Sequence, residues 1–395
     1  MKKFQDFISS SETSILKDWN YLHGIAESAF KEHNTSRWLA ERLSAAGFDI
    51  KTGIGGTGVI GRYDTGVKGP QIGLRADMDA LPFEINGEKT CVHACGHDAN
   101  CTEVLWAAIT IRQCNLMKCG CLTVLFQPGE ESLYGADKII ESGELEHLDY
   151  LIGIHLRPIE ELPLGKIAPA VFHGASGSIN IVVSGENAHG ARPQQGVNAI
   201  EAASLIISAI QALPFDPTIP HSVKPTCITS GDSAVNIIPA SVAMIFDVRA
   251  QSNELMDAIK TRVCDAAGHA AASIGARAEC KWRGGVPAGH HFDQLIKLVA
   301  CSIKEACGDD FLADAIYTSG GEDFHKYSVA YPNLQSVVIG VGADLKPGLH
   351  KANMQFDPSA MISAVRVLTT VVLNLLKDVD SKQVSQQNQF KDGNL

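Results

Sequence analysis

The seven residues from Val92 to Asp98, Val-His-Ala-Cys-Gly-His-Asp, contain many side chains that can bind a metal ion. They offer two imidazoles, one thiol and one carboxylate, and Gly96 lets the backbone turn tightly between them. Cys95 and His97 stand two residues apart, so a bent loop can direct both toward one point. Thiolate and imidazole donors suit zinc and other borderline divalent ions. This stretch therefore favours metal chemistry over a purely structural role.

Further potential ligands lie far apart in the sequence, each associated with a short apolar run that predicts a buried strand. They are Glu130 and Glu131 after 122–127, His155 at the end of 151–155, and His350 after 336–341. Ligands at the ends of strands can converge at one edge of a sheet. A metal ion held there polarises a carbonyl group and lowers the pKa of bound water toward ~7. The set predicts a metal-dependent hydrolase.

Asp77 and Asp79 extend this set, because they follow strand 72–75 and residues at i and i+2 share one face of an extended chain. Each candidate also has a structural interpretation. Two adjacent glutamates can stabilise the N-terminus of a helix, a histidine in an apolar strand can be a core residue, and the two aspartates can cap the next segment. The combination of separate sites favours the metal centre over these interpretations.

The elements around these residues predict two domains. Alternating strands and helices between residues 72 and 155 predict an α/β sheet. Residues 175–284 are expected to run strand, helix, strand, strand, helix, strand, which is the ferredoxin-like α+β order. We therefore expect a catalytic metal-binding domain from residues 1–174 and 285–395, with 175–284 inserted as a second domain.

Composition argues against several classes of protein. The 395 residues carry a formal net charge of -11, which disfavours a sequence-independent nucleic-acid binder. No run of about 18 uncharged apolar residues predicts a transmembrane helix, and the N-terminus lacks the apolar core of a secretory signal. Eleven cysteines without framework spacing fit reduced thiols and a cytoplasmic protein. Because there is no Cys-x-x-Cys pair, a thiol-redox or structural zinc protein is disfavoured.

A series of motifs runs from Leu22 to Asp357, nearly the whole chain. It consists of Asp-Met-Asp-Ala-Leu-Pro, His-Ala-Cys-Gly-His-Asp, Gln-Pro-Gly-Glu-Glu, Gly-Ile-His, Ala-His-Gly-Ala-Arg-Pro, Asn-Ile-Ile-Pro, Gly-Glu-Asp-Phe and a late His. This order resembles the N-acyl-amino-acid amidohydrolases, a family that includes hippurate, indole-acetyl-amino-acid and aminobenzoyl-glutamate hydrolases. The family is related to aminoacylases and dinuclear zinc carboxypeptidases. The resemblance implies a zinc-exopeptidase-like domain, with a mixed, mostly parallel sheet flanked by helices, and a lid that also forms a homodimer.

The resemblance also implies a role for each matching residue. The ligands of two divalent metal ions per subunit would be Cys95, His97, Glu131, His155 and His350. Zinc is the first expectation, and manganese, cobalt or nickel would also fit. Glu130 matches the general base and Asp79 an aspartate that orients the site. His189 matches a lid histidine that stabilises the transition state, in cis or across the dimer, while Asn236 and Arg249 match residues that hold the substrate carboxylate.

The chain departs from the family pattern in three places: at Asn100 with Cys101 after it, in the early stretch 22–27, and directly after His350 at 351–353, where relatives often have a proline-containing turn. Asn100 stands where a second histidine usually follows Cys-Gly-His-Asp, and Asp77 stands where distant relatives have a ligand histidine. Three structural questions stay open. Glu322 and Asp323 either support the site or cap a helix, Arg249 has an ion pair within the lid as its alternative role, and Asn236 has a role in a turn as its alternative.

We expect a cytoplasmic, dimeric enzyme that cleaves the amide bond of N-acyl amino acids and binds neither nucleic acid nor membranes. The alternatives are a metallo-dipeptidase or carboxypeptidase that uses the same site, and an inert binder of metal or acyl-amino acid.

Overall fold

The structure, a computed structural model, describes residues 2–231, 234–290 and 292–392, with side chains as far as Lys377 in the last range. The chain forms two compact units. Unit 1 comprises Met1–Phe172, His290–Ile316 and Asp323–Leu395, and unit 2 comprises His173–Gly289 and Tyr317–Glu322.

Unit 2 is larger than the inserted domain expected at 175–284, because its main segment runs from His173 to Gly289 and because Tyr317–Glu322 joins it after the chain has returned to unit 1. From the sequence pattern, Tyr317–Glu322 was expected in the first domain. Hydrogen bonds explain the difference: the backbone N–H of Gly174 donates to the carbonyl oxygens of Thr318 at 2.9 Å and Gly320 at 3.1 Å.

A seven-stranded mixed sheet forms the centre of unit 1, in the order β1-β2-β6-β3-β7-β17-β8. Its strands are β1 (Asp49–Ile54), β2 (Gly58–Asp64), β3 (Gln71–Asp77), β6 (Cys121–Gln127), β7 (Tyr150–Pro158), β8 (Ile167–Ala168) and β17 (Gln335–Leu345). The four strands from β6 to β17 are parallel, and antiparallel strands extend the sheet at both edges. Since parallel strands are covered on both faces, β6 is buried along its whole length.

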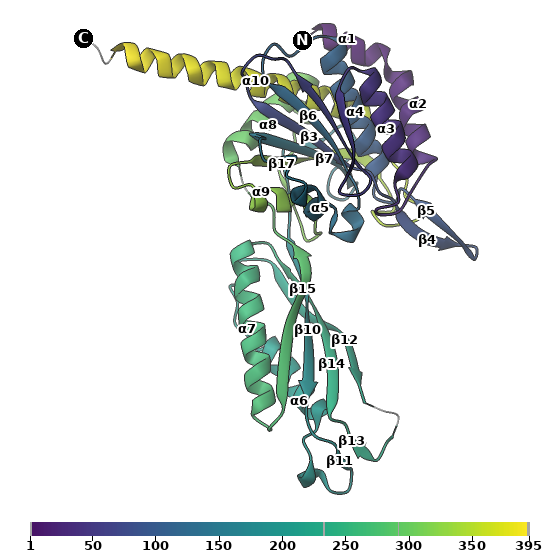
Figure 1. Ribbon diagram of the computed structural model, residues 1–395, viewed down its shortest axis with the longest axis vertical. Coiled ribbons are helices and arrows are strands. Elements are labelled where there is room, and N and C mark those ends of the chain that lie inside the picture. The colour runs from purple at the N-terminus through teal and green to yellow at the C-terminus, as the bar shows by residue number, and fades with distance from the viewer. Residues whose placement is uncertain (1, 232–233, 291, 393–395) are drawn as a thin grey trace. The chain divides into compact units, whose positions relative to one another are not determined.

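Helices cover both faces of this sheet (Figure 1). Consecutive residues of β6 point to opposite faces of the sheet. Val124 packs in the larger hydrophobic cluster on one face, and Leu125 packs in the smaller cluster on the other. The larger cluster contains side chains of α1 (Lys2–Ser10), α2 (Glu12–His23), α3 (His33–Ala45), α4 (His97–Gln113), α8 (Asp293–Cys307) and α10 (Ala360–Asp392). The smaller one contains side chains of α5 (Gly135–Glu141) and α9 (Lys326–Ala330). The predicted helix-flanked α/β sheet is confirmed.

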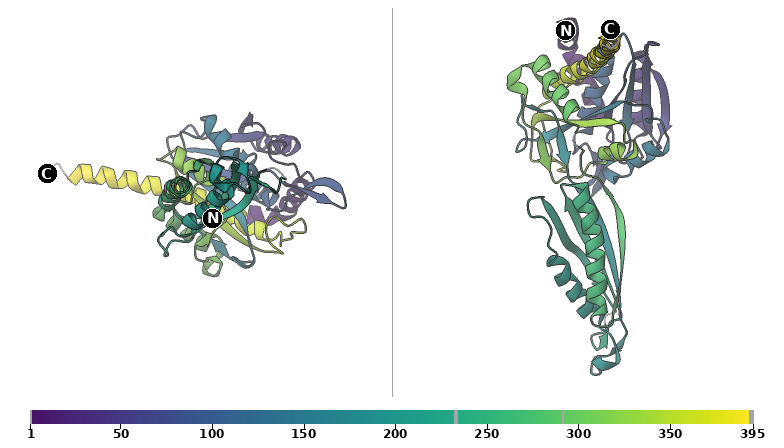
Figure 2. Two further views of the ribbon diagram at one scale, coloured as in Figure 1. Left: turned by 90° about the horizontal axis from the view of Figure 1, so that it is seen from below. Right: turned by 90° about the vertical axis from the view of Figure 1, so that its left-hand side faces the viewer.

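Among the described residues, one helical segment is long and apolar enough to cross a membrane: Ala360–Lys377 of α10, with a mean hydropathy of 1.5. This window is 72% buried and α10 packs against α4 and α8. A buried core helix passes the same test of length and composition, so the segment is weak support for a membrane span. The C-terminal part of α10 extends away from the rest of unit 1 (Figure 1 and the left view of Figure 2).

Unit 2 contains a four-stranded antiparallel sheet in the order β12-β14-β10-β15. In chain order its elements are β10 (Ala175–Ser184), α6 (Ala199–Gln211), β12 (His221–Ser230), β14 (Ser241–Ala250), α7 (Asn253–Ala272) and β15 (Arg277–Val286). This is the ferredoxin-like order expected from the sequence. Side chains of α6 and α7 share one hydrophobic cluster with the sheet, whereas Val182 on the opposite face of β10 is exposed.

Several short elements complete the chain. They are the hairpin β4 (Leu81–Ile85) and β5 (Glu88–Val92), the strands β9 (Val171–His173), β11 (Ala188–His189), β13 (Ile237–Ile238) and β16 (Ile316–Thr318), and the 3-10 turns η1 (Glu130–Ser132), η2 (Pro193–Gln195), η3 (Asp309–Phe311) and η4 (Asp323–His325).

A buried histidine in unit 1 predicts sensitivity to acid. Burial of His325, with a smaller effect of the Arg75 charge, lowers the pKa of its imidazole to about 3. The folded chain holds this ring neutral, whereas the unfolded chain takes up a proton below pH ~6.5. Stability is therefore lost as the pH falls from ~6.5 toward 3, by at most about 1.4 kcal/mol per pH unit from this residue.

We expect His325→Gln to reduce the difference in unfolding free energy between pH 7 and pH 5, measured by urea unfolding. His33→Gln changes an exposed histidine and serves as the matched control. An unchanged pH dependence in His325→Gln would contradict the prediction.

Candidate metal centre

The loop between β5 and α4 brings the first two predicted ligands together. Gly96 adopts a left-handed conformation with φ +87°, which a side chain would strain, and a Cβ there would lie 3.1 Å from Leu156. His97 is the first residue of α4. The tight turn at Gly96 therefore places Cys95 just before the helix and His97 at its start.

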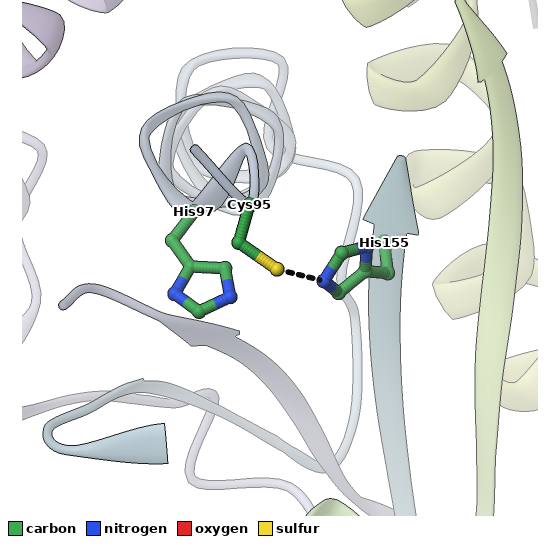
Figure 3. Close-up of side chains that lie close together, drawn as sticks. All are labelled: Cys95, His97 and His155. Carbon is green, nitrogen blue, oxygen red and sulfur yellow. Dashed lines mark hydrogen bonds between the residues drawn. The ribbon is translucent and has the colours of Figure 1, made fainter. Parts of the chain in front are cut away.

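Cys95, His97 and His155 form one donor cluster, with ligand atoms within 4.8 Å of one another (Figure 3). The Sγ atom of Cys95 lies 3.5 Å from Nε2 of His155. All three residues are buried. His155 lies inside β7, opposite Gly340 of β17, and not at the end of its strand as the apolar run suggested.

Cys95, Glu131 and His350 form a second donor cluster that shares the thiol with the first. The Sγ atom of Cys95 lies 3.5 Å from Nε2 of His350, and this Nε2 lies 3.3 Å from Oε1 of Glu131. His350 follows the end of β17, and its backbone N–H donates to the carbonyl oxygen of Ala94. Its side chain is 57% exposed, so this cluster is open to solvent on one side.

Hydrogen bonds direct the imidazoles toward the shared thiol. Nδ1 of His97 lies 2.9 Å from the carbonyl oxygen of Asp79, and Nδ1 of His155 lies 2.6 Å from that of Leu156. Because a carbonyl oxygen only accepts, both Nδ1 atoms donate and both Nε2 atoms face the cluster. Nε2 of His97 is buried and makes no hydrogen bond among the described residues.

Burial and charge set the protonation of the metal-free cluster. Burial raises the pKa of the Cys95 thiol to about 12 and lowers the pKa of His155 to about 4. Burial, the largest single influence on His97, disfavours its charged form, but the negative charge of Asp77 together with the contributions of Cys95 and Asp79 raises the pKa of His97 well above 6.5. A cation that binds here must therefore displace protons.

The donor set fits a borderline divalent ion. Donors around one tetrahedral zinc, at bond lengths of ~2.0–2.3 Å, lie roughly 3.3–3.8 Å from one another. The separations of 3.5, 3.5 and 3.3 Å within the two clusters fall in this range. Cys95 is common to both clusters, so its thiolate would be a donor in each site, and Nε2 of His97 would be available as a donor in the first.

Glu130 and Glu131 leave a tight turn in different directions. Their backbone N–H groups donate to Oδ1 and Oδ2 of Asp79 at 3.2 and 3.0 Å. The carboxylate of Glu131 reaches the second cluster, whereas Oε2 of Glu130 lies 3.9 Å from Nε2 of His97. Asp79 therefore orients the turn that carries both glutamates. Glu130 belongs to neither cluster that contains Cys95, although its carboxylate lies within 4.8 Å of ligand atoms of Asp77 and His97.

Asp77 also faces the first cluster, with Oδ2 3.5 Å from Nε2 of His97. Arg75 donates to its Oδ2 and Asn100 to its Oδ1, both at 2.9 Å. Asn100 stood out in the sequence as a departure from the family pattern, whereas Arg75 was not predicted as part of the site. Arg75 is the one charged residue inside the otherwise apolar strand 72–76, and that contrast was the available signal.

The alternatives left open for Asp323 are both observed. Its Oδ1 accepts from Arg75 at 3.0 Å, which links it to Asp77. Its Oδ2 accepts from the backbone N–H of Ala136 at 2.8 Å, in the first turn of α5. Asp323 thus supports the site and also the start of a helix.

The three lid residues do not meet within one chain. His189 in β11 pairs with Ile237 in β13, directly after Asn236. These two lie next to the start of β14 at Ser241, whereas Arg249 lies near its other end. Eight residues of extended strand separate the ends by roughly 25 Å, so Asn236 and Arg249 of one chain cannot hold the same carboxylate.

Arg249 has partners within unit 2. Its Nε lies 3.2 Å from Oδ2 of Asp247, and its Nη1 donates to the carbonyl oxygen of Ser319 at 3.1 Å. The guanidinium group lines a cavity of about 430 Å³ together with His221, Ser222, Gln251 and Ser319. The structural alternative, an ion pair within the lid, is observed, and the cavity leaves room for a small ligand.

Comparisons with known proteins agree with this fold. The chain matches the model of the peptidase family M20/M25/M40 over residues 73–374. It is 27% identical over 387 residues to the N-acetyl-L-cysteine deacetylase of Bacillus subtilis, which covers 96% of this chain and 92% of that protein. It is 35% identical over 245 residues to the hippurate hydrolase of Campylobacter jejuni, covering 59% and 63%. The crystal structure of the YXEP protein of Bacillus subtilis, a dinuclear metal binding peptidase from the M20 family, matches with a TM-score of 0.80 at 25% identity, covering 95% of this chain and 99% of that one.

The family match spans well over half of the chain, and the protein belongs to peptidase family M20/M25/M40. It is thus an enzyme of the hydrolase class, and the resemblance inferred from its motifs is confirmed.

Proposed function

We propose that this protein is a metal-dependent amidohydrolase that cleaves the amide bond of N-acyl amino acids. One observation carries the proposal: Cys95 belongs to two donor clusters at once, and the Glu130 carboxylate lies beside them. Two of the relatives support the substrate class, because they are named for deacetylating N-acetyl-L-cysteine and hydrolysing hippurate.

The site residues have two kinds of role: five are proposed metal ligands, and Glu130 is the proposed general base. Cys95, His97 and His155 would hold one divalent ion, and Cys95, Glu131 and His350 the other. Such ions polarise the substrate carbonyl and make bound water more acidic. Glu130 accepts a proton from the attacking water and delivers it to the leaving nitrogen, which departs as an amine. The Asp79 carboxylate keeps Glu130 in place for both transfers, since it accepts the backbone N–H of Glu130.

Zinc is the first candidate for both ions, because one thiolate, three imidazoles and one carboxylate are donors that zinc accepts readily. Manganese, cobalt and nickel remain in the proposal, since affinity generally rises across this series and supply decides occupancy. The cytoplasm is the proposed location, because a thiol that must bind metal needs a reducing compartment.

We infer that the active form is a homodimer through the lid. His189 and Asn236 lie at one end of unit 2 and Arg249 near the other, so one lid cannot present all three to one substrate. A second copy can supply the missing pair. His189 and Asn236 are exposed, which leaves them available to a partner chain.

The substrate class is tested by amine release from matched pairs of N-acetyl or N-benzoyl amino acids and dipeptides. We expect turnover of the N-acyl amino acids. A clear preference for dipeptides would favour the metallo-dipeptidase alternative, and metal binding without turnover of any substrate would favour an inert binder.

If Arg249 holds the substrate carboxylate, Arg249→Ala should weaken kcat/KM for free acids by about 10- to 100-fold, since a hydrogen bond to a charged group is worth ~1.5–3 kcal/mol. Substrates whose carboxylate is capped as an amide should lose much less. Arg249→Lys is the matched control, because it keeps the charge but not the planar two-point contact. Equal losses on acids and amides would contradict this role.

A further inference from the structure

The backbone of the turn that carries Glu130 is held by two carboxylates. Asp79 accepts the N–H groups of Glu130 and Glu131. The N–H of the preceding residue, Gly129, donates to Oε1 of Glu32 at 2.9 Å. Three consecutive backbone donors are thus fixed, and the first of them depends on a residue almost a hundred positions away.

Glu32 is fully buried at the start of α3 and uses both of its oxygens. Its Oε1 also accepts the backbone N–H of Phe30 at 2.9 Å, and its Oε2 accepts the hydroxyl of buried Thr57. A fully buried carboxylate with three donors has one geometry available, so it acts as a fixed brace between the 30–32 loop, Thr57 and Gly129.

The backbone conformation of Gly129 depends on contacts with the loop that carries Glu32. Gly129 adopts φ +64°, and a Cβ there would lie 2.6 Å from the Phe30 ring. The same loop therefore fixes Gly129 in two ways: the Phe30 ring packs against it and Glu32 accepts its N–H. A shift of this residue moves Glu130, which follows it directly.

We propose that Glu32 is a positioning residue for the general base Glu130. Among the described residues its carboxylate accepts from Phe30, Thr57 and Gly129 and from no proposed metal donor, so it acts through the Gly129 N–H. The proposal rests on the proposed function for its effect on turnover, and on the structure alone for its effect on the turn.

The test compares Glu32→Ala with Glu32→Gln. The alanine removes the acceptor of the Gly129 N–H, so hydrogen exchange in the segment 127–132 should become more than tenfold faster. Because a misplacement of about 1 Å can cost roughly 100-fold in rate, kcat should fall by about 10- to 100-fold while KM and metal content stay within twofold. The glutamine keeps a carbonyl oxygen at this position and should recover most of both losses.

Glu27→Ala is the matched control. The Glu27 carboxylate lies in the same segment but accepts the N–H groups of Asn34 and Thr35, at the start of α3. It should lower the melting temperature without changing kcat or exchange at 127–132. If Glu32→Ala does not fold, Glu32→Asp replaces it, since the shorter side chain withdraws the acceptor and should produce the same changes.

The proposal fails if exchange at 127–132 is unchanged in folded Glu32→Ala or Glu32→Asp, if Glu27→Ala causes the same loss of kcat, or if Glu32→Gln recovers nothing. A wild-type protein without turnover would defeat the proposed function instead, and the exchange comparison would still decide whether Glu32 holds the turn.

Discussion

Glu130→Gln is expected to lower kcat by about 10²- to 10⁴-fold, the range that a positioned general base contributes. The amide cannot accept the proton of the attacking water or return one to the leaving amine. Metal content should not change, because both donor clusters are complete without Glu130. KM should stay within a few-fold, since the substitution keeps the size of the side chain.

The measurement is steady-state kinetics on the best N-acyl amino acid, with metal quantified in the same preparation. Glu131→Gln is the matched control, because it makes the same change one residue along, in a residue of the second cluster. It should lose metal together with activity. A Glu130→Gln enzyme that stays fast, or one that loses its metal, would contradict the assignment.

Cys95→Ala is expected to weaken binding of both metal ions, because its thiol is the one donor common to the two clusters. Loss of a partner outside the ligand shell already costs roughly 10- to 100-fold in metal affinity, and loss of a donor common to both clusters should exceed this. Turnover should fall in parallel with metal content.

Cys95→Asp tests whether the thiol proton is released when metal binds, because the variant keeps an anionic donor that is already deprotonated. Burial raises the pKa of the Cys95 thiol to about 12 in the metal-free protein, so metal binding near neutral pH must release that proton. Affinity in the wild type should therefore weaken as the pH falls. The aspartate keeps an anionic donor and should release one proton fewer, measured by titration calorimetry in buffers of different ionisation enthalpy. Unchanged metal content in Cys95→Ala would remove Cys95 from the ligand set.

The donor residues could be found in the sequence because their chemical types are unusual where they stand. A thiol, imidazoles and carboxylates beside apolar runs are rare, and the structure brings all five predicted donors together. The alternating pattern of the inserted domain likewise predicted its strands and helices, since hydrophobic periodicity is a local property.

The residues that position the metal donors through hydrogen bonds could not be predicted from the sequence in the same way. Arg75 and Asp323 are 248 positions apart, and Glu32 and Gly129 are 97 apart. Such bonds depend on how distant elements pack, and no local pattern encodes them. For the same reason the sequence did not show that Tyr317–Glu322 returns to unit 2, or that Asn236 and Arg249 lie at opposite ends of β14.

The most direct test of a two-metal amidohydrolase is to strip the purified protein of metal and titrate zinc back while following amine release from an N-acyl amino acid. The same titration is repeated with manganese, cobalt and nickel. We predict no turnover without metal, and activity that rises until two equivalents per chain are bound. Turnover that survives complete removal of metal, or a chain that binds metal yet hydrolyses none of the acyl amino acids and dipeptides, would contradict this account.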